Sequence, residues 1–156
     1  MERLSDANED VLARRRRRRS ETGFGTETEM RDYVLGHLGE IEAGLVPLGG
    51  DEHALEVRCK SRKMRGLDGQ IDILAGGPFP EWVVIECKLG MARPSVLGQI
   101  LGYMAWMHHN FLQMAPMRGI IVATRFSPGV QAAQSLYGLP VTLVECSREW
   151  KFSRVD

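Results

Sequence analysis

The chain has 156 residues, of which 44% are hydrophobic and 26% are charged, and its formal net charge is zero. A chain of this length and composition can bury a core of its own as a single domain. It has no apolar run long enough for a membrane span and no secretory signal, and its three cysteines lack the C-x-x-C spacing of a thiolate zinc site. We therefore expect a cytoplasmic protein with no membrane partner.

The first 20 residues carry a net positive charge, although the net charge of the whole chain is zero. They hold seven arginines, including the run Arg14–Arg19, against four acidic residues, a local charge of +3 that leaves −3 for residues 21–156. Because few of them are apolar, we predict a disordered or loosely helical basic tail over residues 1–25 and a folded domain over residues 26–156. The arginine run is equally typical of non-specific attraction to phosphates and of a solubilising leader.

A helix and a strand are predicted next. Thr26 and Glu29 form a capping box ahead of apolar residues at helical spacing, which indicates an amphipathic helix over about residues 27–42. Gly44 and Pro47 end this helix. Alternating apolar and polar residues then predict a strand with one exposed face within residues 54–63.

Two buried strands follow, over residues 70–75 and 82–88, with a turn at residues 76–78 between them. A second helix begins at Pro94 and Ser95. The last predicted elements are a buried strand, a short helix and a final strand, over residues 119–124, 127–137 and 141–146. This order, α-β-β-β-α-β-α-β, favours an α/β fold with a mixed central β-sheet flanked by helices.

Three ionisable residues interrupt the two buried strands. Asp72 lies between two isoleucines, and Glu86 and Lys88 lie two apart, so that they project from one face of their strand. A carboxylate buried without a partner costs several kcal/mol, and one lysine balances only one of the two acids. A divalent cation would supply the remaining charge, and oxygen ligands suit Mg²⁺ or Mn²⁺.

Each of these residues also has a structural explanation. Asp72 could cap a turn after Gly69, and Glu86 with Lys88 could form an exposed pair on an edge strand. However, the residues around them are too apolar for an edge strand, and a structural role gives no reason for acids in two adjacent strands beside a lysine. We therefore favour a site for chemistry.

The same residues resemble a known nuclease motif. The pattern Gly69-x-Ile71-Asp72 followed by Val84-Ile85-Glu86-x-Lys88 is similar to the PD-(D/E)xK motif. The helical pattern Gln99-Ile100-Leu101-x-Tyr103, the spacings between these groups and the segment IEAGL at residues 41–45 resemble the nuclease domain of the NucS/EndoMS endonucleases. The resemblance covers residues 27–125. It implies a restriction-endonuclease-like core and a metal-dependent DNA endonuclease that hydrolyses phosphodiester bonds and acts in DNA repair.

The resemblance also implies a metal site. Asp72 and Glu86 would bind Mg²⁺ or Mn²⁺ together with the backbone carbonyl of Cys87. Lys88 would orient or deprotonate the attacking water. Phosphodiester hydrolysis needs these parts, because a cation neutralises charge that develops on the phosphate and a positioned water attacks it.

Three further residues match the family on its helices. Glu29 matches the acidic residue of the first helix, although a capping box also calls for a glutamate there and Glu27 is a competing acid. Gln99 and Tyr103, one helical turn apart, would face the site, and they could equally form the polar edge of an amphipathic helix. We include Glu29, Gln99 and Tyr103 among the candidate catalytic residues.

A basic segment departs from the family pattern. The connection between the IEAGL segment and Gly69 is longer than the family's, and it carries five cations, namely Arg58, Lys60, Arg62, Lys63 and Arg65. Alternate cations would line one face of a strand, where they could protect an edge from aggregation or follow a DNA backbone. Beside a phosphodiesterase site we favour DNA binding.

The second departure lies ahead of the core. The family has an N-terminal DNA-binding and dimerising domain, and residues 1–25 with their arginine run stand in its place. The expected partners are therefore DNA and either a second copy of the chain or a separate DNA-recognition protein.

Other functions are also compatible with parts of the pattern. A non-catalytic nucleic-acid-binding module with the same fold would have no need of buried acids. A restriction or defence-type nuclease would use the same motif on other DNA. A two-carboxylate glycosidase would leave Lys88 unexplained.

Overall fold

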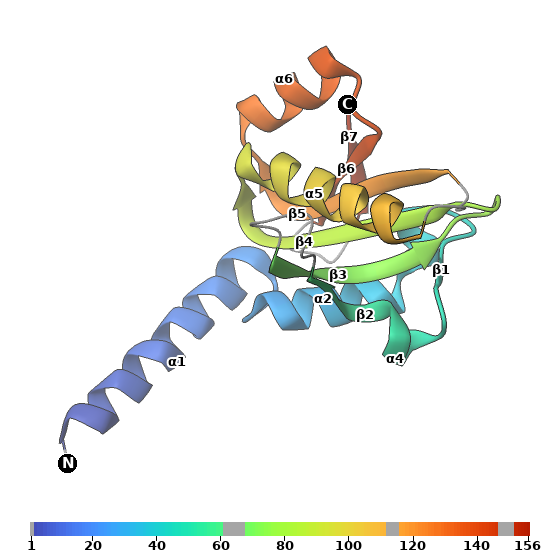
Figure 1. Cartoon of the computed structure of the whole chain (residues 1–156). Helices are drawn as coiled ribbons and strands as arrows, with labels where there is room; N and C mark the ends of the chain where they lie inside the picture. The colour runs from blue at the N-terminus through green and yellow to red at the C-terminus, as the bar shows by residue number, and fades with distance from the viewer. Residues whose placement is uncertain (1, 61–67, 112–115, 147–151) are drawn as a thin grey trace.

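In the part of the chain that the structure describes, seven strands form one central mixed β-sheet (Figure 1). The computed structural model describes residues 2–60, 68–111, 116–146 and 152–156. The strands in this part of the chain are β1 (Val46–Pro47), β2 (Leu55–Lys60), β3 (Asp68–Gly76), β4 (Trp82–Ala92), β5 (Met117–Phe126), β6 (Val141–Cys146) and β7 (Phe152–Val155). The helices are α1 (Glu2–Thr22), α2 (Glu27–Gly36), α3 (Leu38–Ile41), α4 (Asp51–Ala54), α5 (Ser95–Asn110) and α6 (Pro128–Tyr137). None of these described helices is long and apolar enough to cross a membrane.

The order of the strands places β4 inside the sheet. The strands are arranged β1-β3-β4-β5-β6-β7, and β2 also pairs with β3. Strand β3 is antiparallel to β1, β2 and β4, whereas β4, β5 and β6 run parallel and β7 returns antiparallel to β6. Parallel neighbours need a crossover connection, which α5 and α6 supply. The predicted mixed sheet flanked by helices is confirmed.

Helices cover both faces of this sheet (Figure 1). On one face α5 packs through Ile100 and Met107 into a buried cluster that includes Val84 of β4. On the other face α2 packs through Met30 into a second cluster that includes Ile85 of β4. Successive residues of β4 thus enter two different cores, which is why this strand is apolar on both sides.

The helix predicted over residues 27–42 is broken into two helices. His37 leaves the helical conformation, with φ −130° and ψ 25°, so that α2 ends at Gly36 and α3 begins at Leu38. The ring atom Nδ1 of His37 lies 2.7 Å from the carbonyl oxygen of Tyr33. A side chain that bonds to the backbone one turn earlier competes with the helical hydrogen bonds there.

The other predicted elements are present with small changes in their bounds. Strand β4 continues to Ala92 instead of ending at residue 88. The strand expected within residues 54–63 is β2, and residues 61–63 lie outside the described part of the chain. The short elements β1, α4 and β7 were not predicted.

Residues 2–22 form helix α1, which is the helical one of the two forms expected for the basic tail. Arginine, glutamate, alanine and leucine favour the helix, and exposed ion pairs one turn apart support it: Arg14 lies 2.7 Å from Asp10 and Arg17 lies 3.0 Å from Glu21. Figure 1 shows α1 projecting from the rest of the molecule as an arm, next to the start of α2. The division of the chain at residue 26 stays a prediction.

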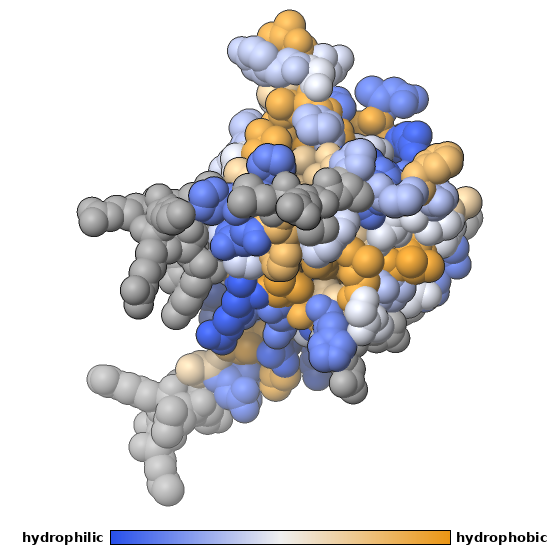
Figure 2. Space-filling model, turned by 45° about the vertical axis from the view of Figure 1, so that its right-hand side comes forward, coloured by the Kyte–Doolittle hydropathy of each residue, from blue (hydrophilic) through white to orange (hydrophobic). Residues whose placement is uncertain are grey.

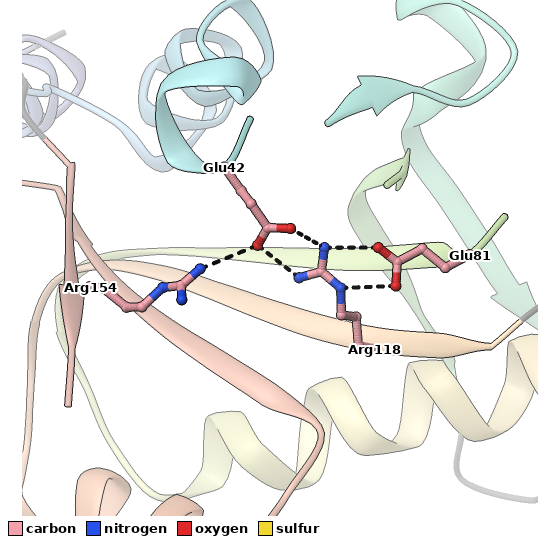
Figure 3. A network of polar contacts seen from close by, with 4 residues as sticks. All are labelled: Glu42, Glu81, Arg118 and Arg154. Atoms are coloured by element: carbon pink, nitrogen blue, oxygen red, sulfur yellow. Dashed lines mark hydrogen bonds and ion pairs between the residues drawn. The ribbon is translucent and has the colours of Figure 1, made fainter. Parts of the chain in front are cut away.

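A network of four charged side chains joins distant parts of the chain at the beginning of β4 and β5 (Figure 3). Arg118 of β5 contacts Glu42 after α3 and also Glu81, whose Oε1 atom lies 3.0 Å from Nη2 of Arg118. Arg154 of β7 reaches Glu42 at 3.5 Å. Because Arg118 and both acids are half-buried, these contacts tie the end of α3 to strands β5 and β7 of the sheet.

Helix α6 is attached mainly through its first turn. Val130 is its buried residue, whereas Leu136 and Tyr137 near its end are 77% and 74% exposed. Figure 2 shows a small hydrophobic area at the top of the molecule, where α6 lies. Gly138 then ends the helix in the left-handed conformation, at φ +56°.

Candidate active site

Strands β3 and β4 separate where the acidic residues begin. Ile73 and Ile85 form the last described pair of this ladder on the side of the acids. Asp72 and Glu86 come next, and Oδ2 of Asp72 accepts a hydrogen bond from the backbone N–H of Cys87 at 2.8 Å. A side chain of β3 thus satisfies a backbone donor of β4 where the regular pairing ends. The two predicted acids meet at this split.

Glu86 and Lys88 lie on the same side of β4, as their spacing predicts. The Glu86 side chain is 3% exposed, and its Oε1 atom lies 3.0 Å from Nζ of Lys88, whose side chain is 29% exposed. The second oxygen, Oε2, is buried and has no hydrogen-bond partner among the described residues. Cys87, between them, points into the core on the α2 side. Lys88 therefore compensates only part of the buried carboxylate.

The electrostatics of the site favour protonation of its acids. Burial raises the pKa of Asp72, although the hydrogen bond from Cys87 opposes this effect. Burial and the neighbouring charge of Asp72 raise the pKa of Glu86 to about 8, against the opposing effect of Lys88. Burial is the largest effect on the pKa of Lys88 and lowers it, but the ion pair with Glu86 and the charges of Glu27 and Asp72 together raise this pKa above its ordinary value. Two acids share one ammonium group here, so the pair is short of positive charge.

The donor set fits a hard divalent cation. The unpaired Oε2 of Glu86 is an oxygen that a cation could satisfy, and the adjacent Asp72 carboxylate is a second oxygen donor. Among the described residues, however, no group of three or more His, Cys, Asp or Glu side chains lies close enough to hold an ion. The complete ligand set, with the carbonyl of Cys87, stays a prediction.

Gln99 and Tyr103 of α5 form a linked pair beside the acids. The Gln99 Nε2 atom donates a hydrogen bond to Oη of Tyr103 at 3.1 Å. Burial raises the pKa of Tyr103, the hydrogen bond from Gln99 opposes this, and the charges of Glu86 and Asp72 raise it further. A Cβ atom at Gly69 would lie 2.6 Å from the Tyr103 oxygen, so the glycine makes room for this hydroxyl. The structure brings Tyr103 into the electrostatic range of both acids.

Comparison with known proteins identifies solved structures of similar fold. No protein-family model and no curated protein sequence matches the chain. A repair endonuclease from Pyrococcus abyssi has a TM-score of 0.59 and 22% identity, over 79% of this chain and 47% of that one. EndoMS in complex with double-stranded DNA has a TM-score of 0.56 and 23% identity, over 77% of this chain and 44% of that one. EndoMS in its apo form has a TM-score of 0.58 and 22% identity, over 78% of this chain and 46% of that one.

The chain has the fold of these endonucleases. The resemblance to the NucS/EndoMS nuclease domain, inferred from the motif residues, is confirmed at the level of fold. The chain spans slightly less than half the length of the three structures that it matches.

Glu29 is held at the start of α2, whereas Glu27 lines a small pocket together with Asp72. Oε1 of Glu29 lies 2.6 Å from Nη2 of Arg19, and Oε2 accepts a hydrogen bond from the N–H of Gly25 at 2.7 Å. Glu27 instead accepts from the N–H of Leu89 at 3.2 Å, and its charge raises the pKa of Asp72. The third position of the capping box directs Glu29 to the start of the helix. Which of the two acids serves as the helix acid of the site stays a prediction.

The sequence did not predict the ion pair between Arg31 and Glu56 beside Asp72. Arg31 of α2 is 13% exposed and lies 2.5 Å from Oε1 of Glu56 and 2.9 Å from Oδ1 of Asp32. Glu56 has φ +52°, and it is the one described residue other than glycine with positive φ. Arg31, Glu56, Glu27 and Asp72 line one small pocket of about 130 Å³. The only sequence signal was the spacing of four between Glu27 and Arg31, which puts both on one helix face.

The structure describes little of the predicted DNA-binding segment. Arg58 is exposed in β2, opposite Gln70, and alternates with buried Cys59 as predicted. Lys60 ends β2, but its side chain lies outside the described part of the structure, as do residues Arg62, Lys63 and Arg65. DNA binding by this segment therefore stays a prediction.

Proposed function

We propose that this chain is a metal-dependent DNA endonuclease that hydrolyses phosphodiester bonds in DNA repair. The observation that carries the proposal is the buried Glu86 carboxylate, which has one oxygen paired with Lys88 and the other without a partner among the described residues, next to Asp72. A protein that only binds nucleic acid gains nothing from such a pair, because burying it opposes folding. The fold shared with a repair endonuclease and with EndoMS bound to double-stranded DNA supports the choice of substrate.

Asp72, Glu86 and the carbonyl of Cys87 are the proposed ligands of Mg²⁺ or Mn²⁺. The bound cation would supply the positive charge that these acids lack and would stabilise negative charge on the phosphate. Asp72 is held in place by its hydrogen bond from Cys87, and Glu86 is fixed by burial and by Lys88. The acids are therefore positioned before a ligand arrives, which reduces the cost of ordering them.

Lys88 is proposed to orient the attacking water and to stabilise charge on the phosphate. Its raised pKa keeps the amine protonated near neutral pH, so it can donate hydrogen bonds but does not accept the proton of the water in this state. Its partial exposure leaves it accessible to a substrate, unlike Glu86. Tyr103, positioned by Gln99, is a second donor on the α5 side of the site.

A plasmid-nicking assay tests this function. Supercoiled DNA should be nicked by the wild-type chain with Mg²⁺ or Mn²⁺, and the product should be absent with a chelator or with Asp72→Asn. Glu40→Gln, which changes an exposed acid of α3, serves as the matched control and should cleave like the wild type. DNA binding without cleavage under all metal conditions would instead support the non-catalytic module. Labelled duplex, mismatched, flap and single-stranded oligonucleotides would then identify the substrate.

A further inference from the structure

A groove runs between the arm α1 and the end of the strands that carry the candidate site. It has a volume of about 500 Å³. Its walls come from the last turns of α1 and from the ends of β4 and β5, namely Arg17, Glu21, Thr22, Gly90, Thr124 and Arg125. Residues that are distant in the sequence thus form one surface, and helix α1 supplies one of its walls.

The groove begins where the candidate site ends. Gly90 follows Lys88 by two residues, at an irregularity in the pairing of β4 with β5. Its N–H donates to Oγ1 of Thr124 at 3.0 Å, and its backbone has φ +91°, a conformation that favours glycine. A Cβ atom at Gly90 would meet no heavy atom within 4 Å. The wall of the groove is therefore open beside Lys88.

Two arginines from different elements line this surface. Arg17 contacts Glu21 through Nε at 3.0 Å, but both side chains are more than half exposed, so a stronger anion could displace this weak pair. Arg125 is exposed, and within the described ranges it has no ion-pair partner. Against one carboxylate the groove thus presents two guanidinium groups, whose planar donors suit phosphate oxygens.

The arm is held to the body at the base of the groove. Oγ1 of Thr22, which is buried, donates to the carbonyl oxygen of Arg18 at 2.7 Å and lies 2.9 Å from the carbonyl oxygen of Phe24. Arg19 pairs with Glu29 of α2 at 2.6 Å. These contacts fix the direction in which α1 leaves the body (Figure 1), so Arg17 faces the groove as part of the folded structure.

We propose that this groove binds the backbone of the DNA strand next to the phosphodiester bond cleaved at Asp72 and Glu86, with Arg17 and Arg125 contacting its phosphates. The inference rests on the proposed nuclease function for its substrate. It differs from a diffuse attraction by the arginine run, because it assigns contacts to one face of α1. Arg16, the neighbour of Arg17, lies on a surface formed by residues of α1 alone and provides the matched control.

Salt-dependent binding tests the assignment. Fluorescence anisotropy with a labelled duplex oligonucleotide would be measured over a range of salt concentrations in an Asp72→Asn background, which is expected not to cleave. Arg17→Ala and Arg125→Ala should each weaken binding and reduce the slope of log K against log salt by about 0.9, the value for one lost phosphate contact. Arg16→Ala should change the slope much less. Equal effects of Arg16→Ala and Arg17→Ala would overturn the proposal.

Neutral phosphates locate the contact on the DNA. Single methylphosphonate substitutions on one side of the cleaved bond should weaken binding of the wild-type groove. A substitution at the phosphate that one arginine contacts should have no further effect on the alanine variant of that arginine. Loss of affinity that is additive with both variants would reject the groove. If the chain binds DNA in this pattern but never nicks it, only the nuclease function is rejected. If the wild-type chain nicks DNA but Arg17→Ala and Arg125→Ala leave binding unaffected, only the groove is rejected.

Discussion

The Glu86 carboxylate and the Lys88 ammonium group form an ion pair at 3.0 Å in which the acid is buried and the lysine is partly exposed. Asp72 adds a second carboxylate at the split between β3 and β4, and it engages the backbone of Cys87 rather than a second cation. The site is thus short of one positive charge.

Asp72→Asn and Glu86→Gln should each abolish metal-dependent cleavage while the chain remains folded. Neutralising either acid relieves repulsion in the metal-free protein, so its melting temperature should be equal to or higher than that of the wild type. The increase in melting temperature on adding Mn²⁺ should be lost. Thermal melts with and without metal, set beside cleavage rates, measure both effects. A variant that cleaves normally, or one that fails to fold, would make the acids structural.

The stability of the metal-free protein should fall as the pH rises from about 4.5 to about 8, between the ordinary pKa of Glu86 and its raised value in the fold. In this interval the unfolded carboxyl has lost its proton while the folded one retains it, so the folded state binds more protons. Thermal melts in a chelator at pH 5 and pH 8 check this sign. Glu86→Gln should flatten the profile, and a wild-type protein that gains stability over this interval would contradict it.

Lys88→Ala should keep the stabilisation by metal and lose most of the cleavage, by about 100-fold or more. The ammonium group acts on water or phosphate in our proposal, whereas the acids hold the cation. Single-turnover cleavage at saturating DNA separates this effect from binding. If Lys88→Ala instead lost the metal-dependent rise in melting temperature, the lysine would serve mainly to position Glu86.

Glu27→Gln and Glu29→Gln should have opposite effects, although both change the first turn of α2. Glu27→Gln should reduce cleavage with little change in stability, since Glu27 is exposed and bonds to the backbone of Leu89 at the site. Glu29→Gln should preserve cleavage and lower stability by about 1 kcal/mol, because it weakens a helix-start contact and the pair with Arg19. The cleavage rate and the midpoint of urea unfolding, both measured for the two variants, distinguish the roles of Glu27 and Glu29. The reverse result would return Glu29 to the site.

Arg118→Met should destabilise the fold by about 2 kcal/mol, because it leaves the half-buried Glu42 and Glu81 without their shared cation. The control is Arg154→Met, whose side chain is 61% exposed and which should cost about 0.5 kcal/mol or less. Urea unfolding at neutral pH measures both variants. Equal effects would show that the network in Figure 3 is not organised around Arg118.

The strands of the site were predictable because their sequences are dominated by core packing. Apolar runs around Asp72 and Glu86 specify β3 and β4, and the interval of two residues specifies that Glu86 and Lys88 share a side. The short strands β1 and β7 have no such signal, since they depend on pairing with β3 and β6. Their formation is decided by tertiary context rather than by local sequence.

The choice between Glu27 and Glu29 could not be made from periodicity. Both acids lie in the first turn of α2, and only the positions of Leu89 and Arg19 in space separate their roles. The pair of Arg31 and Glu56 likewise joins α2 to β2 across 25 residues of sequence. Local sequence patterns do not identify such distant partners. They do indicate that residues 2–22 tend to form a helix, a tendency that we underestimated because this segment has few apolar residues.

The position of β4 in the sheet has a consequence for the order of folding. β3 and β4 are consecutive strands joined by a short connection, so closing this hairpin brings the two carboxylates together early. Strand β5 pairs with the other edge of β4, and helix α5 separates these two strands in the sequence. The dehydration of Glu86 is therefore completed when β5 docks. The docking of β5 is later and less local than the closing of the hairpin. We expect it to be the step of refolding that alkaline conditions slow and that divalent cations accelerate.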